Sequence, residues 1–159
     1  MFSVWFSPLK TAAKLVTFAL IASGLACSSG SSPTEPSAPP SASASLTGTW
    51  SGSASDSSGP GQMTWQITQS GTSVSGTMTM TDTSTKVTGR GTISGTVSGS
   101  SLQFTVSVLA GGFDNPYNTC SANVAGNATI STSSLSGTYD GSSSCSGAIT
   151  SGQLTLNKQ

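Results

Sequence analysis

Cysteine and aspartate are the residues of this chain best suited to chemistry. The 159-residue sequence contains three cysteines and no histidine, so it lacks the commonest general base and metal ligand. Serine is abundant, but a serine nucleophile needs a base and an orienting partner, and the usual histidine base is missing. We therefore predict that the protein is not an enzyme and that it uses no cofactor and no metal.

Cys120 and Cys145 are predicted to form a disulfide bond. Paired cysteines are common in exported proteins. In the entropic model this bond would close a loop of about 25 residues and add about 3 kcal/mol of stability. The alternative, a metal site, would need histidine or further cysteine ligands.

The aspartates of the predicted folded domain all fall in connections between strands: Asp56, Asp82, Asp114 and Asp140. One interpretation is a carboxylate rim that attracts a basic partner or a cation, such as a weakly held Ca²⁺ ion. The other is that aspartate is simply a good turn residue. We favour the second, because no two of these carboxylates have the spacing of an EF-hand or another known ligand set.

The first 26 residues are typical of a signal peptide. Lys10 and Lys14 precede an apolar run over residues 15–26, which is too short to span a bilayer. The small residues before Cys27 resemble the lipobox of bacterial lipoproteins, in which the cysteine becomes the lipidated N-terminus after cleavage. This resemblance implies a lipid anchor on Cys27, and Ser28 favours the outer membrane. The alternative is ordinary secretory cleavage, which would leave Cys27 as a plain thiol.

Residues 27–45 are predicted to be a tether. After the cysteine they are almost wholly Ser, Pro, Ala, Gly and Thr, and Glu35 carries the only charge. A segment of this composition cannot bury a core and is expected to be a flexible, disordered linker. The predicted order is a signal peptide over 1–26, a lipidated cysteine and linker over 27–45, and a folded domain over 46–159.

A five-residue pattern recurs in the folded domain: apolar, hydroxyl, glycine, hydroxyl, apolar. Its copies begin at Leu46, Val74, Ile93 and Leu135. Alternation with a period of two is typical of a strand with one buried face and one wet face. Eight such strands follow one another with no crossover long enough for parallel pairing. We predict an all-β fold, an eight-stranded antiparallel up-and-down β-barrel, with a bulge around Ser151 in the last strand.

Connections in an up-and-down barrel alternate between its two ends. The longer connections share one end, which we call the mouth, and the short turns share the other, the floor. The glycine pattern falls near the floor, so we expect aromatic side chains to lie over these glycines and plug it. The larger apolar residues predicted to line the interior and contact a ligand are Trp50, Trp65, Met78, Met80, Phe104, Val106 and Tyr139.

The mouth connection over residues 111–118 is the long one that carries aromatic residues. Phe113, Asp114 and Tyr117 could contact a partner or close over the mouth, because loops on a rigid barrel often carry binding. Equally, Phe113 and Tyr117 could only cap the core.

Two known families resemble part of this domain. The segment Leu46-Thr47-Gly48-Thr49-Trp50, followed by Ser75-Gly76-Thr77, resembles the opening of avidin-like proteins, and Gly48-x-Trp50 is similar to a lipocalin signature. These calycin-type families are eight-stranded barrels that bind small, largely apolar ligands through the mouth, which implies such binding here. The biotin site does not carry over, because Gly52 and Met78 stand where avidins place binding residues.

The leading functional hypothesis is an exported cell-envelope lipoprotein whose barrel binds a small apolar ligand. One alternative is a partner-binding or protease-inhibitor-type barrel that uses its mouth loops. Another is a structural envelope module with no specific ligand. The expected partners are a membrane, through the lipid anchor, and a small ligand or envelope protein. Nucleic acid is not expected, because the net charge is zero and no basic cluster occurs.

Overall fold

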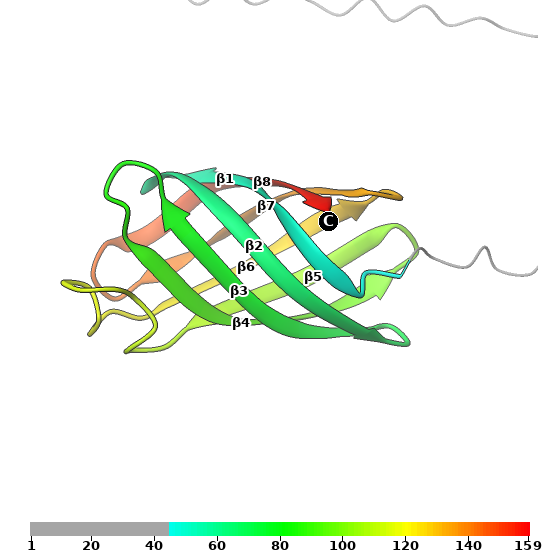
Figure 1. Cartoon of the computed structure of the whole chain (residues 1–159), viewed down its shortest axis with the longest axis horizontal. Coiled ribbons are helices and arrows are strands. Elements are labelled where there is room, and N and C mark those ends of the chain that lie inside the picture. Colours follow the sequence, from blue (N-terminus) through cyan, green and yellow to red (C-terminus); the bar gives the residue numbers. More distant parts are fainter. Residues whose placement is uncertain (1–44) are drawn as a thin grey trace, which may run out of the picture. The chain divides into compact units, whose positions relative to one another are not determined.

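Residues 45–159 are described by the computed structural model and form a closed β-barrel (Figure 1). Each strand pairs antiparallel with the next, and the last pairs with the first. The strands are β1 Gly48–Asp56, β2 Gly59–Ser70, β3 Ser73–Asp82, β4 Thr88–Ser98, β5 Ser101–Val108, β6 Ala122–Ile130, β7 Ser134–Ser143 and β8 Gly147–Lys158. The predicted eight-stranded antiparallel up-and-down barrel is confirmed. The predicted signal peptide and the lipidation site Cys27 lie outside the described residues.

Alternating burial explains why this sequence forms a barrel. In β3, Val74 and Met78 are buried, whereas Ser75, Thr77 and Thr79 are exposed. Apolar side chains leave water on the inner face, at about 25 cal/mol per Å² of buried area, while hydroxyl side chains on the outer face stay hydrated. No polar or charged residue between 45 and 159 is fully buried, so the interior is almost free of charge.

The pairing of β1 with β8 closes the sheet. This ladder runs from Trp50 opposite Lys158 to Ser55 opposite Gln153. Beyond it, the Gln159 backbone N–H donates to the Thr49 carbonyl oxygen at 2.9 Å. Because the first and last strands pair with each other, neither leaves an open edge for another chain.

A bulge interrupts the pairing of β7 with β8, as predicted. Tyr139 lies opposite Gly152, but Gly141 lies opposite Ile149, so β8 holds one extra residue at this point. Ser151 takes a positive φ of 58°, and its backbone N–H donates to Asp140 Oδ1 at 3.0 Å. The bulge changes the phase of β8, so that both Ile149 and the later leucines of the strand face inward.

Three of the four central glycines of the repeated pattern, Gly76, Gly95 and Gly137, lie close to the backbone of a neighbouring strand, and none of the four lies under an aromatic ring as expected. A Cβ at Gly76 would overlap the carbonyl oxygen of Gln66, on the neighbouring strand, and a Cβ at Gly137 would overlap that of Asn127. The rings lie instead over glycines nearer the mouth. A Cβ at Gly126 would be 2.7 Å from Phe104 Cζ. Neighbouring strands can therefore approach closely at these glycines, because glycine has no side chain to hold them apart.

The floor is filled by one tryptophan and a group of aliphatic side chains. Trp50 is almost fully buried, and its indole Nε1–H donates to the Leu46 carbonyl oxygen at 2.8 Å. The Lys158 ammonium lies 5.5 Å from the centre of the Trp50 ring and donates to the Ser45 carbonyl oxygen at 2.8 Å. The aliphatic residues packed at this end include Leu46, Ile67, Val74, Val97, Leu102, Leu135 and Leu156. This end of the barrel is closed.

Candidate ligand cavity at the mouth of the barrel

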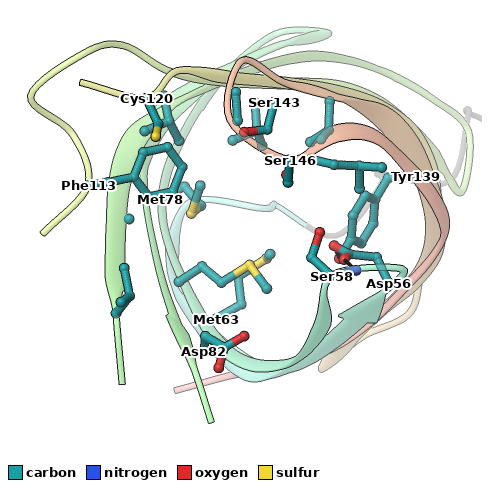
Figure 2. Close-up of a pocket in the computed structure, with 18 of the residues that line it drawn as sticks. Asp56, Ser58, Met63, Met78, Asp82, Phe113, Cys120, Tyr139, Ser143 and Ser146 are labelled. Atoms are coloured by element: carbon teal, nitrogen blue, oxygen red, sulfur yellow. Dashed lines mark hydrogen bonds between the residues drawn. The ribbon is translucent and has the colours of Figure 1, made fainter. Parts of the chain in front are cut away.

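A cavity of about 330 Å³ occupies the mouth half of the barrel (Figure 2). Its walls take residues from every strand, β1 to β8, and from the mouth loops. The volume falls within the range of about 300–1,000 Å³ that is usual for small-molecule sites. The apolar wall residues are Met63, Trp65, Met78, Met80, Val87, Phe104, Val106, Val108, Phe113, Ala122, Val124, Ile149 and Leu154.

Trp65 forms the deepest part of the β2 wall. Ile67, the next inward residue toward the floor, no longer lines the cavity. The Trp65 ring meets Phe104 edge to face, with centroids 5.1 Å apart and planes at 63°, a favourable aromatic geometry. Its indole Nε1–H is buried and has no hydrogen-bond partner among residues 45–159. A buried donor left in this state costs about 1–3 kcal/mol.

Tyr139 and Asp56 form a polar pair in the wall near the mouth (Figure 2). The Tyr139 hydroxyl donates to Asp56 Oδ2 at 2.8 Å, and Asp56 Oδ1 accepts the Ser58 backbone N–H at 2.7 Å. Burial raises the pKa of the Tyr139 phenol well above its usual value, and the hydrogen bond to the Asp56 carboxylate raises that pKa further. Tyr139 therefore stays neutral and keeps donating across the physiological range.

Asp82 is the second carboxylate of the cavity wall. Its Oδ1 accepts the backbone N–H groups of Thr85 at 2.7 Å and Ser84 at 2.8 Å. The hydrogen bond from Thr85 lowers the pKa of Asp82, and the Ser84 N–H and nearby Lys86 lower it further against a smaller opposing effect of burial. Asp82 is therefore ionised near neutral pH. Lys86 itself does not line the cavity, and its ammonium donates to the Thr83 carbonyl oxygen at 2.6 Å.

The loop after β5 crosses the edge of the mouth and places Phe113 in the cavity wall (Figure 2). Phe113 bridges to Gly89 of β4, where a Cβ would be 2.6 Å from Phe113 Cε1. The Asp114 backbone N–H donates to the Thr88 carbonyl oxygen at 2.9 Å. The Arg90 guanidinium also donates to Asp114 Oδ1 at 2.8 Å, and the two side chains form an ion pair. These contacts hold the loop against β4.

The predicted disulfide is confirmed, and it lies in the cavity wall. Cys120 and Cys145 are bonded, with their Cα atoms 5.6 Å apart, and both line the cavity. The bond ties the end of the long loop to the turn between β7 and β8. It therefore adds a covalent link just beyond the mouth end of the β6–β7 ladder, where Ala122 lies opposite Ser143.

No protein family, characterised protein or solved structure matches this chain. Within residues 45–159, no group of three or more cysteine or acidic side chains could hold a metal ion. The same residues contain no helix long and apolar enough to cross a membrane.

Most of the residues proposed from sequence for ligand contact meet in this cavity. Those that line it are Trp65, Met78, Met80, Phe104, Val106 and Tyr139. Trp50 does not, because it is packed into the floor below. Of the loop residues, Phe113 and Tyr117 line the cavity, and Tyr117 is 44% exposed. Asp114 points to Arg90 instead, and this ion pair lowers the pKa of the Asp114 carboxyl.

Sequence reasoning did not single out Met63, Val108, Asp56 or Asp82 as ligand-contacting residues. Met63 and Val108 could have been found, because the same alternation that marks Trp65 and Phe104 places them inward. For the two aspartates, the sequence favours a role as turn residues over a carboxylate rim. The signal for them was their position at the mouth end of β1 and β3, but only the structure shows that both lie in the wall.

Proposed function

We propose that this protein is a non-catalytic binding protein that takes a small, largely apolar molecule into the mouth of its barrel. The observation that supports the proposal is that one half of the barrel interior is filled with side chains and the other half is hollow. The floor half is filled by Trp50 and aliphatic side chains, whereas the mouth half holds a cavity of about 330 Å³. A barrel of this size can close completely on its own side chains, so a cavity confined to one end is typical of a binding site.

The size and lining of the cavity favour a ligand with an apolar body. An apolar protein cavity of about 150 Å³ is large enough to bind benzene, and this one is about twice that volume. Methionine side chains at Met63, Met78 and Met80 are flexible and polarisable, so they adapt to ligands of different shape. Aromatic rings at Trp65 and Phe104 add large, rigid contact area.

We further propose that the barrel is carried on a lipid anchor in the cell envelope. The apolar run over residues 15–26 and the small residues before Cys27 support an exported lipoprotein. The disulfide between Cys120 and Cys145 supports an oxidising compartment. Labelling of growing cells with a radioactive fatty acid tests the anchor. Labelled wild-type protein and unlabelled Cys27→Ser protein are expected, and label on Cys27→Ser would contradict it.

Binding is tested with a neutral fluorescent probe such as phenylnaphthylamine and the purified full-length chain. Saturable fluorescence enhancement is expected, because the probe leaves water for an apolar cavity. Val106→Phe fills the cavity from β5 and should reduce probe binding. Thr105→Phe is the matched control, since Thr105 lies on the same strand and does not line the cavity. Equal probe binding by both variants, with both barrels folded by circular dichroism, would contradict the proposal.

A second candidate is a protein partner that docks on the long mouth loop. Among residues 45–159 the exposed large apolar side chains are Leu109, at 74%, and Tyr117, at 44%, and both lie in the loop after β5. The double variant Phe113→Ala, Tyr117→Ala should abolish capture of an envelope protein while the barrel stays folded. Unchanged capture by this variant would argue against the candidate.

A further inference from the structure

We infer that the cavity is selective for a cationic ligand: an elongated apolar amine whose nitrogen lies between Asp56 and Asp82 at the mouth. This inference rests on the proposed function and adds the chemical class of the ligand. It follows from the placement of charge around the cavity and from the apolar wall below the two carboxylates.

Both carboxylates of the wall lie on the same arc of the mouth. Asp56, at the end of β1, is the register partner of Gly59 in β2. Gly59 also lies beside Asp82, since a Cβ on it would be 3.4 Å from Asp82 Oδ2. The two acidic side chains therefore flank the start of β2, and Figure 2 shows both at the edge of the cavity.

No lysine or arginine lines the cavity in the described part of the chain. Arg90 forms an ion pair with Asp114 at 2.8 Å, and neither residue lines the cavity. Lys158 lies at the floor, over Trp50. Lys86 is the cation nearest Asp82, and its ammonium is held by the Thr83 carbonyl oxygen. An anionic head group in the cavity would therefore meet two carboxylates and no cation within the wall.

Both carboxylates retain capacity for a further donor. A carboxylate has about four lone-pair sites. Asp56 accepts from Tyr139 and Ser58, and Asp82 accepts from the backbone of Ser84 and Thr85 and from the Thr85 side chain. Each can accept at least one more hydrogen bond, and an ammonium group offers three donors. The aromatic rings of Tyr139 and Phe113 also line the cavity, and the face of an aromatic ring attracts a cation.

The deepest wall points to a ligand that reaches well below the mouth. Trp65 Nε1–H is buried, faces no acceptor among residues 45–159, and belongs to a side chain that lines the cavity. Gly61 is the register partner of Asp82, and it is separated from Trp65 by about 13 Å along β2 at the usual rise per residue. A ligand whose apolar body reaches the level of Trp65 and whose amine stays at the mouth would fill both levels of the cavity.

The test uses three compounds that differ only in the head group: methoxyphenylbutylamine, methoxyphenylbutanol and methoxyphenylbutyrate. Each competes with phenylnaphthylamine for the full-length chain at neutral pH. The amine is expected to bind at least tenfold more tightly than the alcohol, and the acid is expected to bind most weakly. Raising the salt concentration should weaken binding of the amine and leave the alcohol unchanged, because only the charged pair is screened.

Isosteric variants locate the effect. Asp56→Asn and Asp82→Asn should each weaken amine binding at least about tenfold, the usual size of one hydrogen bond to a charged group, and should weaken alcohol binding much less. Asp140→Asn is the matched control, because Asp140 lies at the same end of the barrel but outside the cavity wall. Circular dichroism checks that each variant is folded.

The outcomes separate this inference from the proposed function. If the alcohol or the acid competes as well as the amine, or if both aspartate variants bind the amine like wild type, the head-group preference is overturned while apolar binding stands. If phenylnaphthylamine itself does not bind, the proposed function and this inference fail together.

Discussion

The phenol of Tyr139 and the carboxylate of Asp56 are joined by a 2.8 Å hydrogen bond, although 83 residues separate them in the chain. The bond connects the middle of β7 to the end of β1, two strands that are not neighbours in the barrel. The strand between them is β8. The hydrogen bond therefore spans β8 on the inside of the barrel and joins the mouth end of β1 to β7.

Removal of the Tyr139 hydroxyl should destabilise the barrel and change its response to alkali. Tyr139→Phe is expected to lower the free energy of unfolding by about 1–3 kcal/mol, the usual loss for a hydrogen bond to a charged group. The pKa of Tyr139 is raised in the folded state, so above pH 10 the unfolded chain releases a proton that the folded chain retains. Wild-type stability should therefore fall as pH rises above 10, by at most about 1.4 kcal/mol per unit from this group.

Urea denaturation at a series of pH values measures this effect. The Tyr139→Phe protein should show a shallower decline above pH 10 than wild type. Parallel declines in the two proteins would mean that Tyr139 ionises in the folded state as it does in the unfolded chain.

Loss of the disulfide should loosen the mouth and leave the floor intact. The double variant Cys120→Ser, Cys145→Ser is expected to lose about 3 kcal/mol of stability, since the bond closes a long loop. Because both cysteines line the cavity, affinity for phenylnaphthylamine should fall as well. Hydrogen exchange should increase in the loop after β5 and remain slow around Trp50. Equally faster hydrogen exchange at the mouth and at the floor would contradict the prediction that only the mouth loosens.

The two tryptophans of the barrel should respond differently to the same substitution. Trp50 Nε1–H donates to the Leu46 carbonyl oxygen at 2.8 Å, whereas Trp65 Nε1–H has no partner among the described residues. Trp50→Phe leaves a buried carbonyl unpaired, and Trp65→Phe removes a donor that was already unpaired. We expect Trp50→Phe to be about 1–2 kcal/mol more destabilising, measured by urea denaturation. Equal losses would show that Trp65 finds a partner, such as ordered water, in solution.

The glycine at the centre of the repeated pattern should be intolerant of a methyl group. Gly76→Ala would place its Cβ against the Gln66 carbonyl oxygen, so the two strands must move apart. We expect a loss of at least about 2 kcal/mol, in the range of overpacking at a rigid site. Thr77→Ala is the matched control, since Thr77 is the exposed neighbour in β3, and it should cost less than about 1 kcal/mol. Similar midpoints of thermal unfolding for both variants would refute the close approach.

Phe113 should control how fast a ligand leaves the cavity. Its ring lies over Gly89 at the edge of the mouth. Phe113→Ala is expected to speed dissociation of phenylnaphthylamine several-fold in stopped-flow displacement, with a small effect on stability. Arg90→Ala removes only an exposed ion pair, which is worth at most about 1 kcal/mol, and should leave the dissociation rate near that of wild type. If Arg90→Ala speeds ligand dissociation more than Phe113→Ala does, the ion pair and not the Phe113 ring controls the dissociation rate.

The amino-acid sequence by itself determined the strands, their order and the two unlike ends of the barrel. Alternation of residue type is a local property, because successive side chains of a strand face opposite sides. It places Met78 inward and Thr77 outward before any packing is known. Connection parity alone brings Cys120 and Cys145 to one end, and their bonding there is confirmed. The bulge near Ser151 was also visible, because the alternation changes phase within β8.

Only the tertiary structure decided which inward residues fill the barrel and which surround a cavity. Trp50 and Trp65 have the same side-chain type and the same inward direction, yet one plugs the floor and the other lines the cavity. Whether space remains between them depends on the tilt and spacing of all the strands and on contacts across the barrel. The contact of Asp56 with Tyr139 likewise arises only when the sheet closes. These features depend on three-dimensional distances between residues far apart in the chain, which a local pattern does not contain.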